Sequence, residues 1–227
     1  MTLSTRLTLL SVFASLTACH TLKMKVDPQL SDDRMSVSRK GLFSGGDLAF
    51  GEFRAAGVDR GWTHSEETTV FHRTETVAKQ KYQFSFGAGA MVTDHVRCET
   101  VYAETAQTYG RLRIDNGRHG LGCIVSGSDG RPHGELVMTE RSRHRPSGRM
   151  YHEAVAIDLV PSMRGEGARF DTVEPVGYEL RVDGQIVGAV QTINGGAVWI
   201  EASAPPEVRQ AAALASATLL LYQSIDS

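Results

Sequence analysis

The segment from residue 208 to 222, VRQAAALASATLLLY, most strongly limits what this chain can fold into. It follows Pro205, Pro206 and Glu207, and both a proline in the first turn and an acidic side chain near the N-terminal end favour a helix. The large apolar side chains of such a helix fall on every side of it. Because a helix that is apolar all round must be buried all round, we predict an enclosed helix over residues 205–222.

The chain before this helix predicts strands, since apolar and polar residues alternate in short segments separated by turn residues. Asp183-Gly184, between GYELRV and QIVGAV, favours a tight hairpin. Asn194-Gly195-Gly196 then precedes AVWIE, so residues 176–201 are predicted to form a three-stranded meander. The other predicted strands cover residues 48–54, 67–73, 81–87, 89–98, 111–115, 121–126, 135–140 and 151–160.

These patterns together predict a mainly β fold, with a single antiparallel domain of about eleven to twelve strands. A sheet closed into a barrel around the C-terminal helix would cover that helix on every side. The alternative is an open sheet or a sandwich with the helix packed on one face, which would leave the other side of the helix in water.

The segment 176–222, with GYELRV, the Asp-Gly turn, QIVGAV, AVWIE and AALASATLLLY, resembles the C-terminal part of tubby-like domains, a family that includes the phospholipid scramblases. This resemblance implies a closed barrel of about twelve strands around an apolar helix. The first two thirds of the chain match that family only in having many short strands. The same ending also resembles uncharacterised proteobacterial lipoproteins, a likeness that implies no activity.

Residues 1–18 are predicted to be a lipoprotein signal peptide. The apolar run Leu7–Leu16 follows Arg6 and is about ten residues long, whereas a membrane-spanning helix needs about 20. The residues LTAC, 16–19, resemble a bacterial lipobox, which implies that Cys19 is lipidated after cleavage. An ordinary signal peptide is the alternative. Two or more acyl chains on Cys19 would anchor the protein durably to a membrane.

The anchor predicts a location and a domain layout. We expect a lipid-anchored protein of the bacterial cell envelope that faces the periplasm, with the membrane as its first partner. His20 follows Cys19 where an aspartate would favour the inner membrane, so the outer membrane is preferred. Residues 19–34 are polar and contain Pro28, which predicts a lipidated N-terminus and flexible tether, with the domain proper over residues 35–227.

Two further cysteines, Cys98 and Cys123, are predicted to form a disulfide, because an even pair in an exported protein is most often oxidised. Two free thiols or a metal site are the alternatives. No CxxC motif supports a metal site.

The charges of the chain argue against nucleic acid as a partner and leave anionic lipid headgroups open. The formal net charge is −2, which argues against a nucleic-acid-binding protein. One basic cluster stands out, RSRHRPSGR, with Arg141, Arg143, Arg145 and Arg149. A solvated loop is the plain interpretation, whereas a possible anion contact with lipid headgroups is the more specific one. An envelope protein is the other partner that we expect.

We predict no catalytic residue, no metal site and no cofactor. His152-Glu153 begins an HExxH-like segment, but Ala156 occupies the position of the second histidine. The other seven histidines are scattered, and the GxSxG motif of serine hydrolases is absent. The predicted function is a non-catalytic binding or structural role. The alternative is a hydrolase of envelope lipid or glycan whose acid–base groups meet only in the folded protein.

Overall fold

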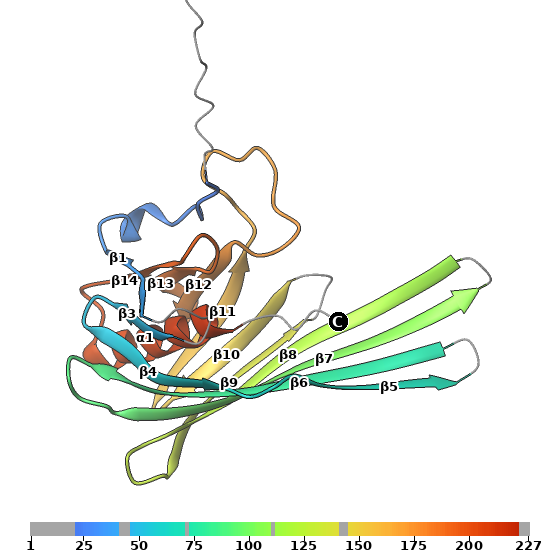
Figure 1. Ribbon diagram of the computed structural model, residues 1–227. Helices are drawn as coiled ribbons and strands as arrows, with labels where there is room; N and C mark the ends of the chain where they lie inside the picture. The colour runs from blue at the N-terminus through green and yellow to red at the C-terminus, as the bar shows by residue number, and fades with distance from the viewer. Residues whose placement is uncertain (1–20, 41–45, 71–72, 110–111, 141–144, 223–227) are drawn as a thin grey trace, which may run out of the picture.

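The computed structural model describes residues 21–40, 46–70, 73–109, 112–140 and 145–222 (Figure 1). Fourteen strands, one short 3₁₀ helix and one α-helix make up the fold. In chain order they are η1 (Pro28–Leu30), β1 (Arg34–Ser36), β2 (Ser38–Lys40), β3 (Asp47–Phe50), β4 (Phe53–Arg60), β5 (His64–Val70), β6 (Arg73–Ala88), β7 (Asp94–Tyr109), β8 (Leu112–Ser126), β9 (Pro132–Glu140), β10 (Pro146–His152), β11 (Val155–Ser162), β12 (Gly177–Val182), β13 (Gln185–Gln191), β14 (Ala197–Ile200) and α1 (Pro206–Leu221).

The strands form one antiparallel sheet in the order β1-β14-β13-β12-β11-β10-β9-β8-β7-β6-β4-β3-β2, and β5 pairs with β6 outside this path. The strands at the two ends of the order, β1 and β2, are separated in the chain only by Val37. Residues 34–40 therefore pair with β14 through their first half and with β3 through their second half. This segment brings the edges of the sheet together, so that the sheet is nearly closed into a barrel.

Helix α1 fills the interior of this barrel (Figure 1). All of residues 211–221 are buried, and Leu219, Leu220 and Leu221, which point in three different directions, are at most 5% exposed. The hydroxyl groups of Ser216 and Thr218 donate hydrogen bonds to the carbonyls of the residues four positions earlier, at 2.8 and 2.9 Å, so neither needs a partner in the wall. The enclosed helix predicted from the sequence is thus confirmed.

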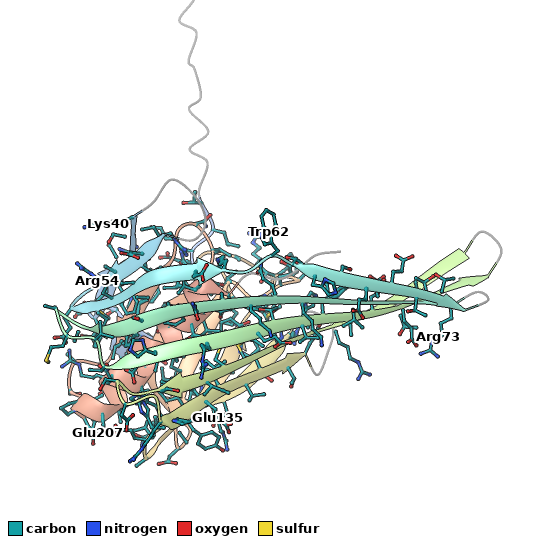
Figure 2. The ribbon with its side chains drawn as sticks, turned by 60° about the horizontal axis from the view of Figure 1, so that its bottom comes forward. Lys40, Arg54, Trp62, Arg73, Glu135 and Glu207 are labelled. Atoms are coloured by element: carbon teal, nitrogen blue, oxygen red, sulfur yellow. A yellow bond between two sulfur atoms is a disulfide. The ribbon has the colours of Figure 1, made fainter. Side chains whose placement is uncertain are left out.

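Three strands are much longer than the barrel requires. β6, β7 and β8 contain 16, 16 and 15 residues, which corresponds to roughly 50 Å for the longest of them. Their barrel portions carry buried side chains such as Phe86, Val96 and Val125. The remaining portions, residues 73–80, 99–109 and 112–120, continue together with β5 as a twisted ribbon beyond the barrel (Figures 1 and 2). We call this four-stranded extension the blade.

The folded domain begins earlier than the predicted boundary at residue 35. Met24 and Leu30 are buried against Trp199 and its neighbours on the outside of the barrel. The amide of Met24 donates to the side-chain oxygen of Gln191 over 2.9 Å, and the amide of Lys25 donates to the carbonyl of Arg164 over 2.9 Å. Residues 24–34 therefore lie against the domain rather than forming part of a flexible tether.

The fourteen strands among the described residues exceed the predicted eleven to twelve, because tight hairpins occur inside two of the predicted strands and because β1 and β2 were not predicted. The predicted strand 48–54 turns at Gly51, and the predicted strand 151–160 turns at Glu153, each with φ of 53°. Across each turn the buried positions change from even to odd numbers, as from Phe50 to Phe53, but a segment this short contains too few residues on either side to show the change in the sequence.

In β8 the structure joins what the sequence divided: the predicted strands 111–115 and 121–126 belong to one continuous strand. The predicted meander is confirmed as β12, β13 and β14. Its first turn has Asp183 and Gly184 at φ of 49° and 81°, the left-handed conformation that the Asp-Gly pair favours.

Candidate functional site

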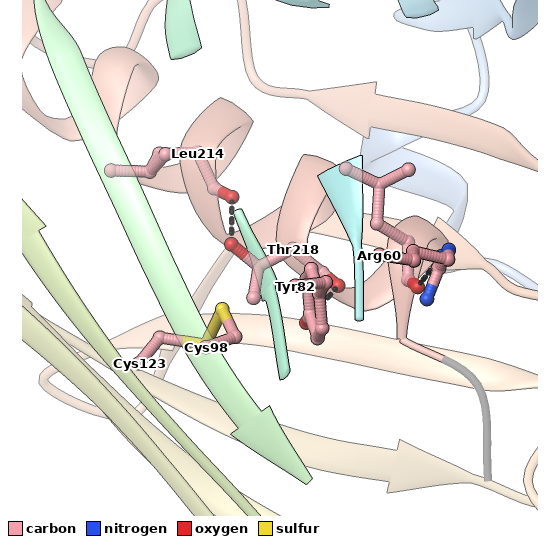
Figure 3. The surroundings of a disulfide bond; sticks show 7 residues. Arg60, Tyr82, Cys98, Cys123, Leu214 and Thr218 are labelled. Atoms are coloured by element: carbon pink, nitrogen blue, oxygen red, sulfur yellow. Dashed lines mark hydrogen bonds between the residues drawn. A yellow bond between two sulfur atoms is a disulfide. The ribbon is translucent and has the colours of Figure 1, made fainter. Parts of the chain in front are cut away.

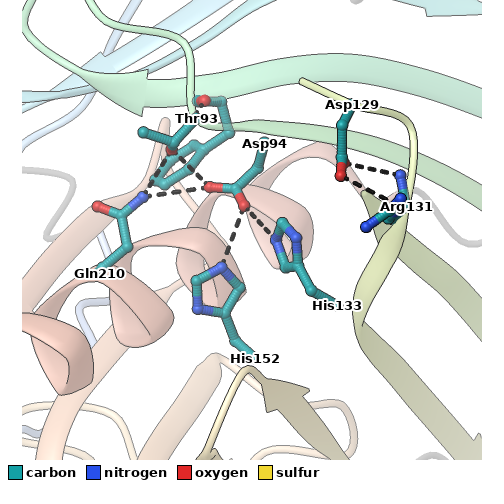
Figure 4. Close-up of polar contacts among 8 residues, drawn as sticks. Thr93, Asp94, Asp129, Arg131, His133, His152 and Gln210 are labelled. Carbon is teal, nitrogen blue, oxygen red and sulfur yellow. Dashed lines mark hydrogen bonds and ion pairs between the residues drawn. The ribbon is translucent and has the colours of Figure 1, made fainter. Parts of the chain in front are cut away.

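Three side chains meet at the end of the barrel where α1 begins (Figure 4). Asp94 is the first residue of β7, His133 is the second residue of β9, and His152 is the last residue of β10. Nε2 of His133 lies 2.7 Å from Oδ1 of Asp94, and Nε2 of His152 lies 3.1 Å from the same oxygen. The two imidazole rings stand edge to face, with their centroids 5.2 Å apart. We call these three residues the rim cluster.

The backbone of β9 and β10 positions the two histidines. Gly134 pairs with His152 in the sheet, and a Cβ atom at residue 134 would lie 2.6 Å from the carbonyl oxygen of Tyr151. Only glycine therefore permits this close approach of the strands. The turn that follows places Glu153 in the left-handed region, and the amide of Glu153 donates to the carbonyl of His133 over 2.8 Å. This turn fixes His152 next to His133.

The carboxylate of Asp94 is nearly inaccessible to solvent and has partners on both oxygens. Its Oδ2 accepts hydrogen bonds from the hydroxyl of Thr93 over 2.6 Å and from the side-chain amide of Gln210 over 3.2 Å. Burial by itself raises the pKa of Asp94, but the hydrogen bonds from His152, Thr93 and His133 outweigh burial and lower the pKa to about 2. Asp94 is consequently an anion at neutral pH.

The rim cluster offers two imidazole nitrogens and a carboxylate oxygen, all within 4.8 Å of one another. Such a set can hold a divalent metal ion, or it can form a hydrogen-bonded network without an ion. The sequence analysis did not group these residues, because they lie 39 and 58 positions apart. The prediction of one strand over 151–160 also hid the turn after His152, which is the last residue of β10. The only local signal was the His-Glu pair at residues 152–153.

The predicted cysteine pair forms a disulfide between directly opposed residues of β7 and β8 (Figure 3). Cys98 and Cys123 face the interior, in the core that includes Tyr82 and Leu214. Both lie where the blade leaves the barrel, so the bond closes the β7–β8 hairpin at its root. The predicted lipidation site, Cys19, is outside the described residues.

The structure does not bring the four predicted arginines together as one anion site. Arg141 and Arg143 are outside the described residues. Arg145 is exposed just before β10, whereas Arg149 in β10 donates to the carboxylate of Asp158 over 2.6 Å. The hydrogen bonds to Asp158 and Tyr151 raise the pKa of Arg149. Because Asp158 already neutralises this guanidinium, Arg149 is a weaker candidate for an anion contact than the sequence indicated.

Two other arginines, which the sequence analysis did not single out, close the opposite end of the barrel. Arg39 donates to the carbonyl of Leu220 over 2.9 Å, and Arg60 donates to the carbonyl of Leu221. The guanidinium of Arg60 also lies over the ring of Tyr82, 5.2 Å from its centroid. Positive charge at this position stabilises the negative end of the helix dipole, so we assign Arg39 and Arg60 a structural role.

Two hollows of the described surface lie outside the barrel. One, of about 530 Å³, is lined by Gln83, His95 and Arg97 among others, and the other, of about 540 Å³, is lined by Val101, Arg118 and His119 among others. The interior is occupied by α1. A ligand of this protein would therefore bind at the outer surface or at the rim.

Comparison with known proteins identifies no relative: no family model, no curated protein and no solved structure matches the chain. Among the described residues, no helix has the length and apolar character needed to cross a membrane.

Proposed function

We propose that this protein is a lipid-anchored protein of the bacterial cell envelope that acts by binding rather than by catalysis. The lipobox-like LTAC and the preceding apolar run support the anchor at Cys19, and the disulfide fits an oxidising compartment such as the periplasm. The outer membrane remains the preferred location, because His20 follows Cys19.

The observation that carries the proposal is the short distance in sequence between the anchor and the folded domain. The side-chain amide of Asn194 donates to the carbonyl of Leu22, and the amide of Glu166 donates to the carbonyl of Lys23 over 2.7 Å. Residues 19–21 are therefore the whole tether, and three residues reach at most about 10 Å. An anchored protein would hold the barrel directly against the lipid surface.

The surface next to Leu22 has the composition expected of such a contact. In the loop between β11 and β12, Phe170 is 85% exposed and Val173 is 75% exposed. Arg164 and Arg169 flank these apolar side chains in the sequence and are also exposed. The same loop carries Glu166, Glu174 and Asp171, which lies 3.8 Å from Arg164, so the exposed apolar side chains rather than the charge favour insertion at the boundary between headgroups and acyl chains.

Helix α1 occupies the interior of the barrel, and we therefore favour binding at the outer surface over catalysis in an internal chamber. The blade provides a long surface with polar side chains beyond the barrel, and we assign contact with an envelope protein to it. Anionic headgroups remain the expected second partner, and among the described residues Arg145 is the candidate contact.

Brominated lipids test the contact with the bilayer. The full chain is placed in vesicles whose acyl chains carry bromine, which quenches nearby tryptophan fluorescence. A Phe170→Trp variant should be quenched strongly. The matched variant Glu207→Trp, at the start of α1 on the other end of the barrel, should not be quenched. Equal quenching of the two variants would contradict the proposed orientation.

The anchor itself is tested separately with Cys19→Ser. This variant should remain unprocessed, or appear in the soluble periplasmic fraction. If it still sediments with membranes after a high-salt wash, the lipid anchor is not what holds the protein to the membrane. Affinity capture of the intact protein from native membranes, with a blade-deleted chain as control, then tests the binding role.

The alternative function is an envelope hydrolase that acts on lipid or glycan. One observation favours it: the rim cluster combines a buried carboxylate with two histidines, one of which reaches solvent. Hydrolysis of envelope lipid or peptidoglycan by the wild-type protein, lost in His133→Asn, would favour this alternative.

A further inference from the structure

We propose that Asp94, His133 and His152 form a binding site for a divalent transition-metal ion of the zinc type. This inference goes beyond the proposed function and does not depend on the lipid anchor. It rests on the distances within the rim cluster, on the chemical nature of its three donor atoms and on the hydrogen bonds that surround them.

The distances fit a tetrahedral ion after a small adjustment. Zinc binds imidazole nitrogen and carboxylate oxygen at about 2.0–2.2 Å, so neighbouring donor atoms of a tetrahedral site lie about 3.3 Å apart. In the structure, Oδ1 of Asp94 lies 2.7 Å from Nε2 of His133 and 3.1 Å from Nε2 of His152. Movements of a few tenths of an ångström would open the cluster enough for the ion.

The donor atoms also select the class of ion. Imidazole suits zinc, copper, iron and nickel, whereas calcium and magnesium require sites made of oxygen. Two nitrogens and one oxygen therefore exclude the alkaline-earth ions. Three protein ligands leave a fourth position, and the 27% exposure of the His133 side chain provides a route by which water could fill it.

Hydrogen bonds outside the cluster orient the carboxylate for binding through one oxygen. Thr93 and Gln210 hold Oδ2 of Asp94, while Oδ1 faces the two histidines. Partners of this kind usually strengthen metal binding, because they fix the orientation of the ligand before the ion arrives. Gln210 belongs to α1, so the cluster connects the wall of the barrel to the helix inside it (Figure 4).

The position of the ligands adds to the argument. All three lie at the ends of barrel strands, and the antiparallel pairing of β9 with β10, which is close at Gly134, fixes the two histidines relative to each other. Ligands on rigid strands lose little conformational entropy on binding. The bound ion would link β7, β9 and β10 at the rim.

Metal titration of the full chain tests the proposal. The protein is purified in detergent without a polyhistidine tag, stripped with a chelator and titrated with Zn²⁺ by calorimetry. Co²⁺ serves as the spectroscopic probe, because its visible absorption reports coordination number. We expect one equivalent of Zn²⁺, and Co²⁺ bands of tetrahedral coordination. His133→Asn should weaken Zn²⁺ binding at least tenfold, in line with the usual effect of disturbing a metal site.

A matched control separates this site from binding by other histidines. His95 adjoins Asp94 on β7, is exposed, and contacts Ser85 rather than the cluster. His95→Asn should bind Zn²⁺ as the wild type does. Zn²⁺ should also raise the melting temperature of the wild type and of His95→Asn but not of His133→Asn, since an ion that binds only the folded state stabilises it.

Two results would overturn the proposal. The first is a wild-type protein that takes up no Zn²⁺ at micromolar concentration, which would leave the cluster as a hydrogen-bonded network. The second is equal binding by His133→Asn and His95→Asn, which would place the ion elsewhere. His152→Asn provides a repeat of the test at the buried ligand, with circular dichroism to verify that each variant is folded.

Discussion

The barrel and the blade are built from the same strands, but their side chains have different surroundings. In the barrel portion of β6, Phe84 and Phe86 are buried against the core around α1. In the blade portion of the same strand, Thr74 and Thr76 occupy the corresponding face and are only half-buried. The hydrogen-bond ladder to β7 continues without interruption through both portions. The difference between the two portions of β6 is that α1 packs against the barrel portion and does not reach the blade portion.

This difference shows which interaction stabilises each region. The barrel gains its stability from apolar side chains buried between the wall and α1, at about 25 cal/mol for each Å² removed from water. Among the described residues α1 does not extend under the blade, so the blade depends mainly on strand pairing and on attachment at its root. Substitutions should therefore have large effects in the barrel and small effects in the blade, and four measurements examine this contrast.

The largest effect is expected from a charge on α1. Leu219→Asp, Leu220→Asp and Leu221→Asp each place a carboxylate in a fully packed core on a different side of the helix. Loss of a buried leucine side chain alone costs about 2–5 kcal/mol, and the charge adds to this cost. Since a whole domain is stable by about 5–15 kcal/mol, each variant should fail to fold. Thermal unfolding by circular dichroism is the measurement. Melting of any one of them within a few degrees of wild type would mean that its side of α1 faces water.

A smaller loss is expected from removing the bond at the root of the blade. The Cys98–Cys123 disulfide closes a loop of 25 residues, which the chain-entropy model values at about 3.5 kcal/mol. The double variant Cys98→Ser/Cys123→Ser should therefore unfold at lower denaturant concentration by about that free energy. A loss of less than 1 kcal/mol would show that strand pairing alone orders the hairpin.

Acid should destabilise the rim of the barrel through Asp94. Its pKa is lowered from an ordinary value of 3.8 to about 2, so its stabilising effect is complete above pH 4 and is lost as the pH falls from about 4 toward 2. The shift corresponds to roughly 2 kcal/mol. Denaturant unfolding of chelator-treated protein at pH 5 and pH 3 measures it. Asp94→Asn should be less stable than wild type at pH 5, and its free energy of unfolding should fall less between pH 5 and pH 3. If the free energy of unfolding fell equally in both proteins, groups other than Asp94 would cause the loss of stability in acid.

One substitution made in both regions gives the smallest and most direct comparison. Val96, in the barrel portion of β7, is buried, whereas Val77, in the blade portion of β6, is 36% exposed. Val96→Thr buries a hydroxyl and should cost about 1–3 kcal/mol. Val77→Thr keeps the shape and the strand propensity and should change stability by less than about 0.5 kcal/mol. Equal changes in the free energy of unfolding would remove the distinction between barrel and blade.

The same contrast explains what the sequence could predict. The helix was predictable because the apolar side chains of residues 211–221 cover its whole circumference, and the Asp183-Gly184 turn has a conformation that few residue pairs favour. Most barrel strands alternate because one face meets the core. The blade gives a weak signal, since polar and small residues occupy both of its faces, and β8 accordingly looked like two separate strands.

The rim cluster could not be predicted from spacing, because its members meet only after three strands have been aligned. The register of β9 and β10, fixed by Gly134 and by the turn at Glu153, brings His133 and His152 together. Asp94 reaches them because β7 begins at the same rim. The disulfide was predictable for another reason: the N-terminal segment predicts export to an oxidising compartment, where a pair of cysteines is most often a disulfide.

The place of α1 in the chain has a consequence for how this protein is made. The helix follows the fourteen described strands, so the filling of the barrel is still missing when the ribosome has completed the sheet-forming part. Contacts between distant segments form late and slowly, and here the last segment provides the surface on which the others pack. If the chain is exported as we propose, this order would benefit it, because the chain would stay unfolded until it had crossed the secretion channel. A premature stop codon before residue 206 would yield no partial barrel, only a polypeptide for quality-control proteases.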